Sequence, residues 1–184
     1  YDDWSFVAWV YLGLYGSYGV AWFLKDMAFP DRNWQRRITW GGGAAAFLLG
    51  LAPYWVLPWW LVSGRGHPPT AAWLVACAIG IHTIGLFLMV AADAQKTFVL
   101  RGRAGLITDG MFRFVRHPNY LGEMMIYGSY ALLVGHWAAW AILLGIWAVE
   151  FVPNMLAKEA SLSRYPEWAA YRSRTGALLP RLGR

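Results

Sequence analysis

A polar, basic stretch, Gly105–Glu123, is the part of this sequence best equipped for chemistry. Within it, Arg116-His117-Pro118-Asn119-Tyr120 combines a fixed cation, a titratable imidazole and a proline suited to the first turn of a helix. The unbonded N–H groups of such a helix start, together with the arginine, can bind a carboxylate or a phosphate. Glu123 follows Asn119 by one helical turn on the same face, where it could bind an amine or a ribose hydroxyl. The stretch therefore predicts a site for a polar cofactor.

Polar side chains on either side of this stretch are further candidates. Gln95 and Lys96 directly follow an apolar segment, and Lys96 could clamp phosphates if the helix continues. Glu159 lies where the last apolar segment ends and could accept hydrogen bonds from a ribose or an amine. Each also has a purely structural interpretation: Arg116 on a lipid phosphate, Lys96 extending its ammonium to the interface, and Glu159 paired with a neighbouring cation. No residue is identified as catalytic from these patterns alone.

The elements that must position these residues are strongly apolar. The 184 residues are 58% hydrophobic and only 14% charged, against roughly 25% charged in soluble domains. Three uncharged runs are long enough to span a bilayer, and a fourth region reads as two tightly connected helices. The composition predicts an all-α, polytopic membrane protein with about five transmembrane helices, the last two forming a C-terminal hairpin. The predicted helices are Trp4–Leu24, Thr39–Gly64, Ala71–Ala92, 119–134 and 138–158.

The distribution of basic residues predicts an orientation. Fifteen of the sixteen Lys and Arg lie in 25–37, 93–116 and the tail from 158, and only Arg65 lies elsewhere. This asymmetry is typical of cytoplasmic loops and predicts an outside N-terminus and a cytosolic C-terminus. The net charge of +6 then faces membrane lipids, and no nucleic-acid-binding motif is present. The single cysteine, Cys77, lies in an apolar run, so no metal site is expected.

Two motifs together resemble a known superfamily. The stretch LITDGMFRFVRHPNYLGE, followed by a hairpin and then KEASLSRYPEWAAYRSRTGALLP, is similar to isoprenylcysteine carboxyl methyltransferases and phospholipid methyltransferases. That superfamily also contains the C-terminal domain of sterol and steroid reductases. The resemblance covers roughly Asp93–Pro180 and implies a cytosol-facing pocket between the 93–123 segment and the 158–180 tail. The chain 1–184 is expected to form a single membrane domain, with three spans in 1–92 and the cofactor-binding region in 93–184.

The methyltransferase branch of the superfamily carries the Arg-His-Pro motif, a carboxylate after the last helix and a Tyr-x-x-Thr-Gly-x-Leu-x-Pro-like tail. The residues that match this tail are Tyr171, Arg174, Thr175, Gly176, Leu178 and Pro180. By this resemblance, His117, Pro118, Tyr120 and Glu159 line a pocket for S-adenosylmethionine.

The reductase branch often reads Arg-His-Pro-Asn-Tyr-x-Gly-Asp/Glu and carries Gln-Lys shortly before it. Asn119, Glu123, Gln95 and Lys96 match that pattern. By this resemblance, the residues that hold NADPH are Lys96, Arg101, Arg116, Asn119 and Tyr120. Reductases also need groups that protonate the substrate, and no clear carboxylate–tyrosine pair is evident within the first three spans.

The favoured hypothesis is an integral membrane S-adenosylmethionine-dependent methyltransferase that acts on a lipophilic or small thiol, carboxyl or amine acceptor. Methyl transfer needs mainly orientation and exclusion of water, and the Thr-Gly-x-Leu-x-Pro tail fits that branch. The first alternative is an NADPH-dependent sterol or steroid reductase-like enzyme. The second is a non-catalytic subunit of a membrane complex or a lipid-binding protein, since fold does not fix function.

Overall fold

The computed structural model describes residues 5–30 and 37–181, and the regular secondary structure of this part of the chain is helical apart from one isolated bridge. Its elements are α1 Phe6–Ala28, α2 Trp40–Ala46, η1 Phe47–Leu51, η2 Ala52–Trp55, α3 Val56–Val62, α4 Ala72–Gly102, η3 Gly110–Phe112, α5 Pro118–Val134, α6 Trp137–Ile146, η4 Trp147–Phe151, α7 Val152–Leu162 and α8 Trp168–Arg174. Within the described residues, four continuous helical stretches are long and apolar enough to cross a membrane: Phe6–Ala28, Trp40–Val62, Ala72–Gly102 and Trp137–Leu162. The prediction of an all-α polytopic membrane protein is confirmed.

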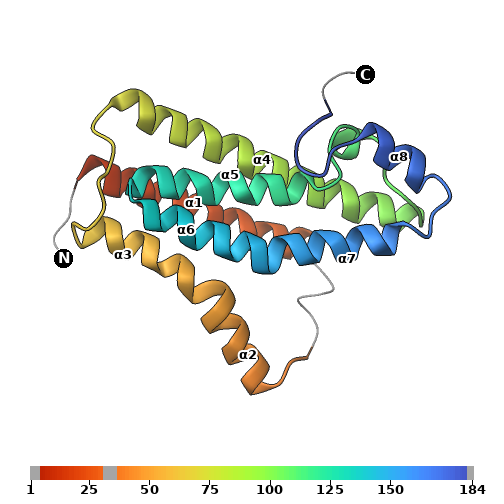
Figure 1. The fold of residues 1–184 in the computed structure, drawn as a ribbon, viewed down its shortest axis with the longest axis horizontal. Helices are drawn as coiled ribbons and strands as arrows, with labels where there is room; N and C mark the ends of the chain where they lie inside the picture. The colour runs from red at the N-terminus through yellow and green to blue at the C-terminus, as the bar shows by residue number, and fades with distance from the viewer. Residues whose placement is uncertain (1–4, 31–36, 182–184) are drawn as a thin grey trace.

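Helix α5 corresponds to the predicted helix 119–134 and begins at Pro118, as the motif indicates. It has 17 residues and lies alongside α4 and α6 in the bundle (Figure 1). Two glycines bring the backbones of α4 and α5 together: a methyl group on Gly122 would lie 2.5 Å from the Gly85 carbonyl oxygen. Because small residues allow such close approach between membrane helices, this contact fixes where the start of α5 lies relative to α4.

The second predicted span is one continuous stretch with changing helical geometry. Its α2 part passes into a π-helical segment, η1, and then a 3₁₀ segment, η2, which contains Pro53. Pro58 lies inside α3, so the prolines alter the helix without ending it. The α2 end diverges from the other helices (Figure 1), and Trp40 is 97% exposed.

The first helix is longer than predicted, because the predicted span ended at Leu24 and the basic segment 25–37 was expected to follow it. Helix α1 continues to Ala28, and Lys25 is buried within it, paired with Asp93 of α4. Helix α4 likewise continues past Ala92 to Gly102, which puts Lys96 and Leu100 on one helix as expected. A charged side chain within a membrane bundle is tolerated when it has a partner of opposite charge. Because Lys25 and Asp93 neutralise each other, α1 and α4 can each continue past their charged residue.

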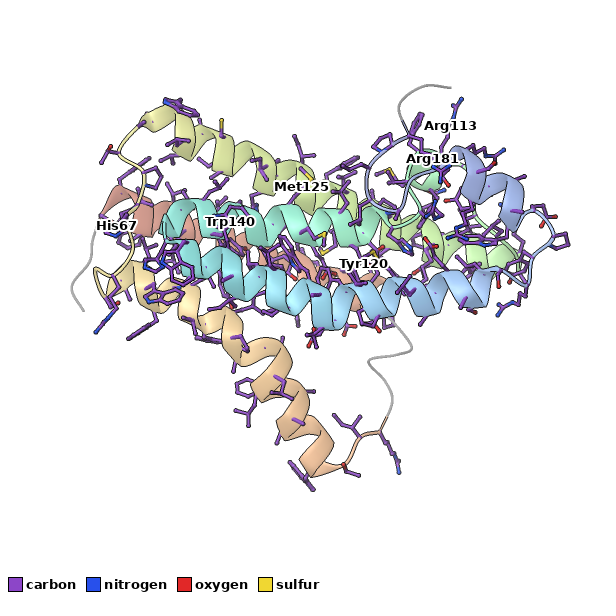
Figure 2. The ribbon with its side chains drawn as sticks, viewed as in Figure 1. His67, Arg113, Tyr120, Met125, Trp140 and Arg181 are labelled. Atoms are coloured by element: carbon purple, nitrogen blue, oxygen red, sulfur yellow. The ribbon has the colours of Figure 1, made fainter. Side chains whose placement is uncertain are left out.

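Aromatic side chains fill much of the space between the helices (Figure 2). Tyr54 stacks on Tyr127 with ring centroids 4.0 Å apart. His82 Nε2 of α4 lies 3.3 Å from the Tyr130 hydroxyl of the neighbouring helix α5. His67 lies at the opposite end of the bundle from the end that carries α8 (Figure 2).

Candidate functional site

The Arg-His-Pro motif is bonded to the C-terminal tail through the backbone. Arg116 N–H donates to the Gly176 carbonyl at 2.9 Å, and His117 N–H donates to the Ala177 carbonyl at 3.0 Å. In return Gly176 N–H donates to the Phe114 carbonyl at 3.3 Å. His117 precedes Pro118 as the N-cap of α5 with φ −129° and ψ 59°, outside the helical conformation that a following proline disfavours. The tail therefore holds the start of α5 in place.

The Arg116 side chain is the centre of a buried polar network. Its Nε donates to Glu159 Oε1 at 2.7 Å, and its Nη1 donates to the Thr175 carbonyl. Glu159 Oε1 also lies 3.3 Å from His117 Nε2, and Glu159 Oε2 lies 3.8 Å from Arg172 Nε. Arg116 and Glu159 are 7% and 13% exposed. The network joins the start of α5, the end of α7 and the tail.

His117 is uncharged in this network. Burial lowers the pKa of His117 below its ordinary value, and the hydrogen bond to Glu159 opposes that shift without cancelling it. A neutral imidazole has one N–H, and facing a carboxylate it donates that proton from Nε2. His117 thus stabilises Glu159 as a hydrogen-bond donor.

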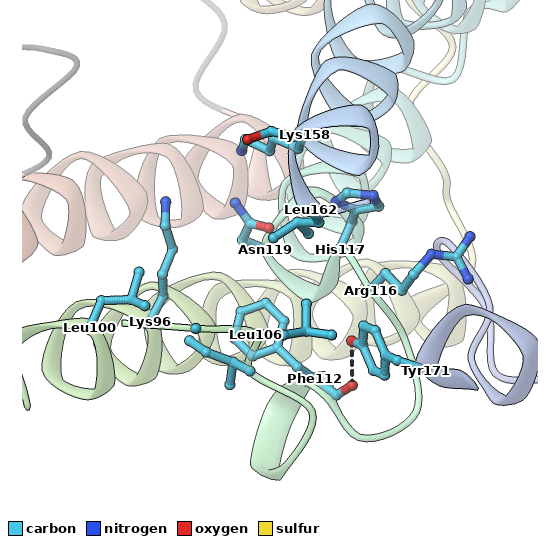
Figure 3. Close-up of a pocket in the computed structure, with 13 residues that line it drawn as sticks. Lys96, Leu100, Leu106, Phe112, Arg116, His117, Asn119, Lys158, Leu162 and Tyr171 are labelled. Carbon is cyan, nitrogen blue, oxygen red and sulfur yellow. Dashed lines mark hydrogen bonds between the residues drawn. The ribbon is translucent and has the colours of Figure 1, made fainter. Parts of the chain in front are cut away.

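A cavity of about 200 Å³ opens beside this network, between α4, the loop before α5, the end of α7 and α8 (Figure 3). Its cationic wall is formed by Lys96, Arg116 and Lys158, and no aspartate or glutamate lines it within the described residues. The full lining is Lys96, Leu100, Gly105, Leu106, Ile107, Phe112, Arg116, His117, Asn119, Lys158, Ser161, Leu162 and Tyr171. The cavity is therefore apolar over most of its surface and positive at its polar edge.

A second hollow of about 690 Å³ adjoins the first, and the two share Gly105, Leu106 and Tyr171. Arg103 and Arg174 are among its lining residues. The shared Tyr171 donates its hydroxyl proton to the Phe112 carbonyl at 2.7 Å (Figure 3), and burial raises the pKa of Tyr171 to about 12. The two hollows form one groove along the loop before α5.

The predicted site residues fall into three groups. Lys96, Arg116, His117, Asn119 and Tyr171 line the first cavity, and Arg174 lines the second hollow. The residues that line neither hollow, in the part of the chain that the structure describes, are Gln95, Arg101, Pro118, Tyr120, Glu123 and Glu159.

Several of the residues outside the hollows have other neighbours. Gln95 holds the loop, because its side chain accepts from Met111 N–H at 2.8 Å and donates to the Asp109 carbonyl at 3.0 Å. Tyr120 packs its ring edge-to-face against Phe151 at 5.1 Å. These residues support the site rather than line it.

Lys158 lines the groove although the sequence did not single it out for a cofactor. Arg103, which follows Lys96 and Leu100 in a segment that could clamp phosphates, lines the second hollow. Lys158 Nζ lies 4.4 Å from the centre of the Tyr120 ring. The helix that carries Lys158 runs to Leu162, four residues past its predicted end. Recognising that the last helix continues to Leu162 would have placed Lys158 on that helix. Arg103 directly follows the end of α4, and the sequence does not show how the chain runs from there.

A second polar cluster lies deeper, inside the bundle. Lys25 of α1 pairs with Asp93 of α4, and the Tyr18 and Tyr127 hydroxyls are 3.2 Å apart. Glu123 of α5 interacts electrostatically with the Lys25–Asp93 pair and with tyrosines 18, 54 and 127. The carboxylate of this cluster belongs to α5 and not to the first three spans, whereas α1 and η2 supply the tyrosines 18 and 54.

Comparison with known proteins identifies the class of this membrane protein. The family described as "Protein of unknown function (DUF1295)" matches residues 47–176. The chain belongs to this family, which lies in the steroid reductase and isoprenylcysteine methyltransferase-like superfamily. The resemblance read from the two motifs is thereby confirmed.

Individual relatives cover a shorter part of the chain. It is 34% identical to "Delta(14)-sterol reductase LBR" of Gallus gallus, over 38% of this chain and 14% of that protein. It is also 29% and 31% identical to two uncharacterized proteins of Schizosaccharomyces pombe, over 45% and 42% of this chain and 31% and 24% of those proteins. The chain thus spans less than a third of the length of each of these relatives. No solved structure matches it.

Proposed function

We propose that this protein is an NADPH-dependent reductase of a carbon–carbon double bond in a sterol-like membrane lipid. The observation that carries the proposal is the charge of the groove. Its first cavity presents Lys96, Arg116 and Lys158 and no described carboxylate. Several phosphate groups are bound by such a set of cations, whereas S-adenosylmethionine has a single carboxylate beside a cationic sulfonium and a cationic amine.

The second hollow supports the same cofactor. A cavity of about 200 Å³ is small for a whole dinucleotide, but the adjoining hollow of about 690 Å³ extends it across Tyr171. Arg103 and Arg174 there provide two further cations for phosphates, and Glu167 in the same lining could accept a hydrogen bond from a ribose hydroxyl. The apolar residues of the first cavity, such as Phe112 and Leu162, suit the nicotinamide ring, which must meet a lipid substrate.

The interior cluster supplies what hydride transfer requires on the other side of a double bond. Hydride adds to one carbon, and a general acid must protonate its neighbour. Glu123, with Tyr18 and Tyr127, is the candidate acid, because these groups interact inside the bundle where a lipid would lie. The relative named as a sterol reductase supports a sterol as the substrate class.

An S-adenosylmethionine-dependent methyltransferase remains the second candidate, and one observation favours it. The Thr-Gly-x-Leu-x-Pro tail typical of that branch is bonded directly to Arg116 and His117. Glu159 would have to leave its bond to Arg116, 2.7 Å long, to receive the amine of the cofactor. A non-catalytic role would leave both cofactors unbound.

The first test is a parallel titration of the purified protein in detergent with NADPH and with S-adenosylmethionine, followed by thermal shift. We expect saturable stabilisation by NADPH and about tenfold weaker NADPH binding in Lys96→Gln, the loss of one charge-assisted hydrogen bond. The matched control is Arg65→Gln, since Arg65 lies in the loop between α3 and α4, away from the groove. Stabilisation by S-adenosylmethionine alone would favour the methyltransferase.

The second test is turnover. The protein in lipid nanodiscs would receive NADPH and a Δ14-unsaturated sterol, and sterol products would be separated by mass. Appearance of the product heavier by two hydrogens supports the proposal. NADPH binding without any reduced sterol would restrict the proposal to cofactor binding and overturn the choice of a sterol.

A further inference from the structure

The second hollow is lined by two arginine side chains that the fold leaves unpaired. Arg103 directly follows α4, and Arg174 is the last residue of α8. Across residues 5–30 and 37–181, neither guanidinium group has an ion pair or a side-chain hydrogen bond. Both side chains are exposed, so holding the fold together does not account for their position in the hollow.

Three other arginines at this end of the bundle are already engaged. Arg172 Nε lies 3.8 Å from Glu159 Oε2, and the side chains of Arg164 and Arg181 each donate a hydrogen bond, at 2.9 Å and 2.7 Å. A bonded guanidinium must give up a partner to bind a ligand, whereas an unbonded one keeps its planar fork for bidentate bonds. The two arginines of the second hollow are therefore ready to bind an anion.

The two guanidinium groups lie where one hollow passes into the other. Gly105 has φ +137°, a conformation that favours glycine, and a methyl group there would lie 3.9 Å from Arg103 Nη1. Arg174 Cζ lies 5.9 Å from the centre of the Tyr171 ring. Gly105 and Tyr171 line both hollows, and Tyr171 is held there by its hydrogen bond to the Phe112 carbonyl (Figure 3). The turn after α4 and the end of α8 thus bring two cations to the same passage.

The difference between the hollows sets the direction of a dinucleotide in the groove. The first cavity, of about 200 Å³, lies at the start of α5 and is lined mainly by apolar residues, which suits the nicotinamide ring. The second hollow, of about 690 Å³, is within the usual size of a ligand pocket and has Tyr165 and Pro166 in its lining. An aromatic side chain offers a stacking surface for a base such as adenine. The adenosine end of the cofactor is therefore expected in the second hollow.

We propose that Arg103 and Arg174 bind the 2′-phosphate of the adenosine ribose and so make the groove selective for NADPH over NADH. This inference rests on the proposed reductase function. A phosphate monoester carries a charge of about −1.5 to −2 near neutral pH, and guanidinium forks match its oxygens. Glu167 in the same lining suits a ribose hydroxyl, but two cations outnumber this one carboxylate. NADH, which lacks the 2′-phosphate, would leave both guanidinium groups without a partner.

Four ligands test the subsite in the purified full chain in detergent: NADPH, NADH, 2′,5′-ADP and 5′-AMP. The members of each pair differ only in the 2′-phosphate. We expect NADPH to bind about 100-fold more tightly than NADH, the worth of two charge-assisted contacts, and 2′,5′-ADP to bind more tightly than 5′-AMP. Arg103→Gln and Arg174→Gln should each weaken NADPH about tenfold and leave NADH unchanged. The double variant should bind the two dinucleotides almost equally.

Two matched variants remove one cation elsewhere. Lys96 lines the first cavity, so Lys96→Gln should weaken NADPH and NADH alike and keep their ratio. Arg113 lines neither hollow and its Cζ lies 5.4 Å from the centre of the Phe114 ring, so Arg113→Gln should change neither affinity. Equal weakening of NADPH and NADH by Arg103→Gln and Arg174→Gln would place these arginines at the pyrophosphate and overturn the inference.

Folding and the proposed function are checked separately. The melting temperature without ligand should be the same in Arg103→Gln, Arg174→Gln and the unmodified protein, because neither side chain is bonded within the described chain. Equal affinity for NADPH and NADH would retain the reductase but exclude a 2′-phosphate subsite. Binding of 2′,5′-ADP that depends on both arginines, in a protein that reduces no sterol, would support the subsite and count against the reductase. Binding of S-adenosylmethionine alone would exclude both.

Discussion

The protein contains two clusters of charged residues that differ in how completely they are paired. At the α8 end, Glu159 has Arg116, His117 and Arg172 as partners, and Arg116 also bonds the tail backbone. Inside the bundle only Lys25 and Asp93 form an ion pair, and Glu123 and Glu150 have none among the described residues. Breaking a buried ion pair leaves a charge uncompensated, so a paired group such as Arg116 stabilises the fold even where it also lines the cavity. Intramembrane carboxylates without an ion pair are candidates for chemistry.

This difference gives the two clusters separate tasks. The paired network fixes the shape of the groove, because it joins α5, α7 and the tail. In the proposed reaction, Glu123 of the interior cluster supplies the proton. Substitution of a paired charge in either cluster should therefore cost stability, whereas substitution of the unpaired Glu123 should cost activity. The following predictions test that contrast from the largest expected effect on stability to the smallest.

Arg116→Ala should cause the largest loss, about 4 kcal/mol in the free energy of unfolding. It leaves Glu159 buried beside a neutral histidine and removes the donor to the Thr175 carbonyl. Thermal unfolding in detergent measures the loss, and Arg116→Lys, which keeps the charge but not the planar fork, should restore only part of it. An unchanged melting temperature would mean that pairing does not organise this end.

Lys25→Met should lower the free energy of unfolding by about 3 kcal/mol, because Asp93 would remain charged inside the bundle. Replacing both residues, as Lys25→Met with Asp93→Leu, should recover most of the loss, since no unpaired charge then remains. The same unfolding measurement applies. A double variant as unstable as the single one would show that the pair is needed for more than mutual neutralisation.

His117 should make stability depend on pH. Because its pKa is lowered in the folded protein, the unfolded chain takes up a proton first as the pH falls. Its contribution is complete above the ordinary histidine pKa of about 6.5 and is lost below it, by at most about 1.4 kcal/mol per pH unit. His117→Gln should make the free energy of unfolding less dependent on pH in this range. His67→Gln, at the opposite end of the bundle, should leave that dependence unchanged. Equal slopes in both variants would contradict the assignment.

Glu123→Gln should leave the free energy of unfolding within about 0.5 kcal/mol, because no ion pair of the described residues is broken. Sterol reduction should nevertheless fall by about 100-fold or more, the usual worth of a general acid, with NADPH affinity unchanged. Thermal shift and product analysis measure the two effects. A large loss of stability would show that Glu123 stabilises the fold as Arg116 does, and would contradict the proposed difference between paired and unpaired charges.

Much of the fold could be read from the sequence. Long uncharged runs predicted the helices α1 and α4, and Pro118 predicted the start of α5. These features are local, since hydropathy and a proline act on their own segment. The same local reasoning predicted that the first span ends at Leu24 and the third at Ala92, because the next charged residue was taken as the end of each span. The helices continue because those charged residues, Lys25 and Asp93, pair with each other.

The candidate site was only partly predictable for the same reason. The Arg-His-Pro motif indicated a polar site, and Lys96, Asn119 and Tyr171 do line the cavity. The motif did not indicate that Gln95 would hold the loop through Met111 and Asp109, since that depends on the fold of the loop between them. Lys158 lines the cavity because the helix that carries it continues to Leu162, beyond its predicted end.

By itself, the sequence determined a polytopic helical membrane protein with a basic, Arg-His-Pro-centred site, because apolar length and motif chemistry are properties of single segments. Only the tertiary structure decided which charges are paired. Arg116 meets Glu159 across 43 positions of the chain and Lys25 meets Asp93 across 68. Glu150 meets Gly50 between two π-helical segments. Such contacts depend on how whole helices pack, and helix packing is set by many residues together rather than by any one pattern along the chain.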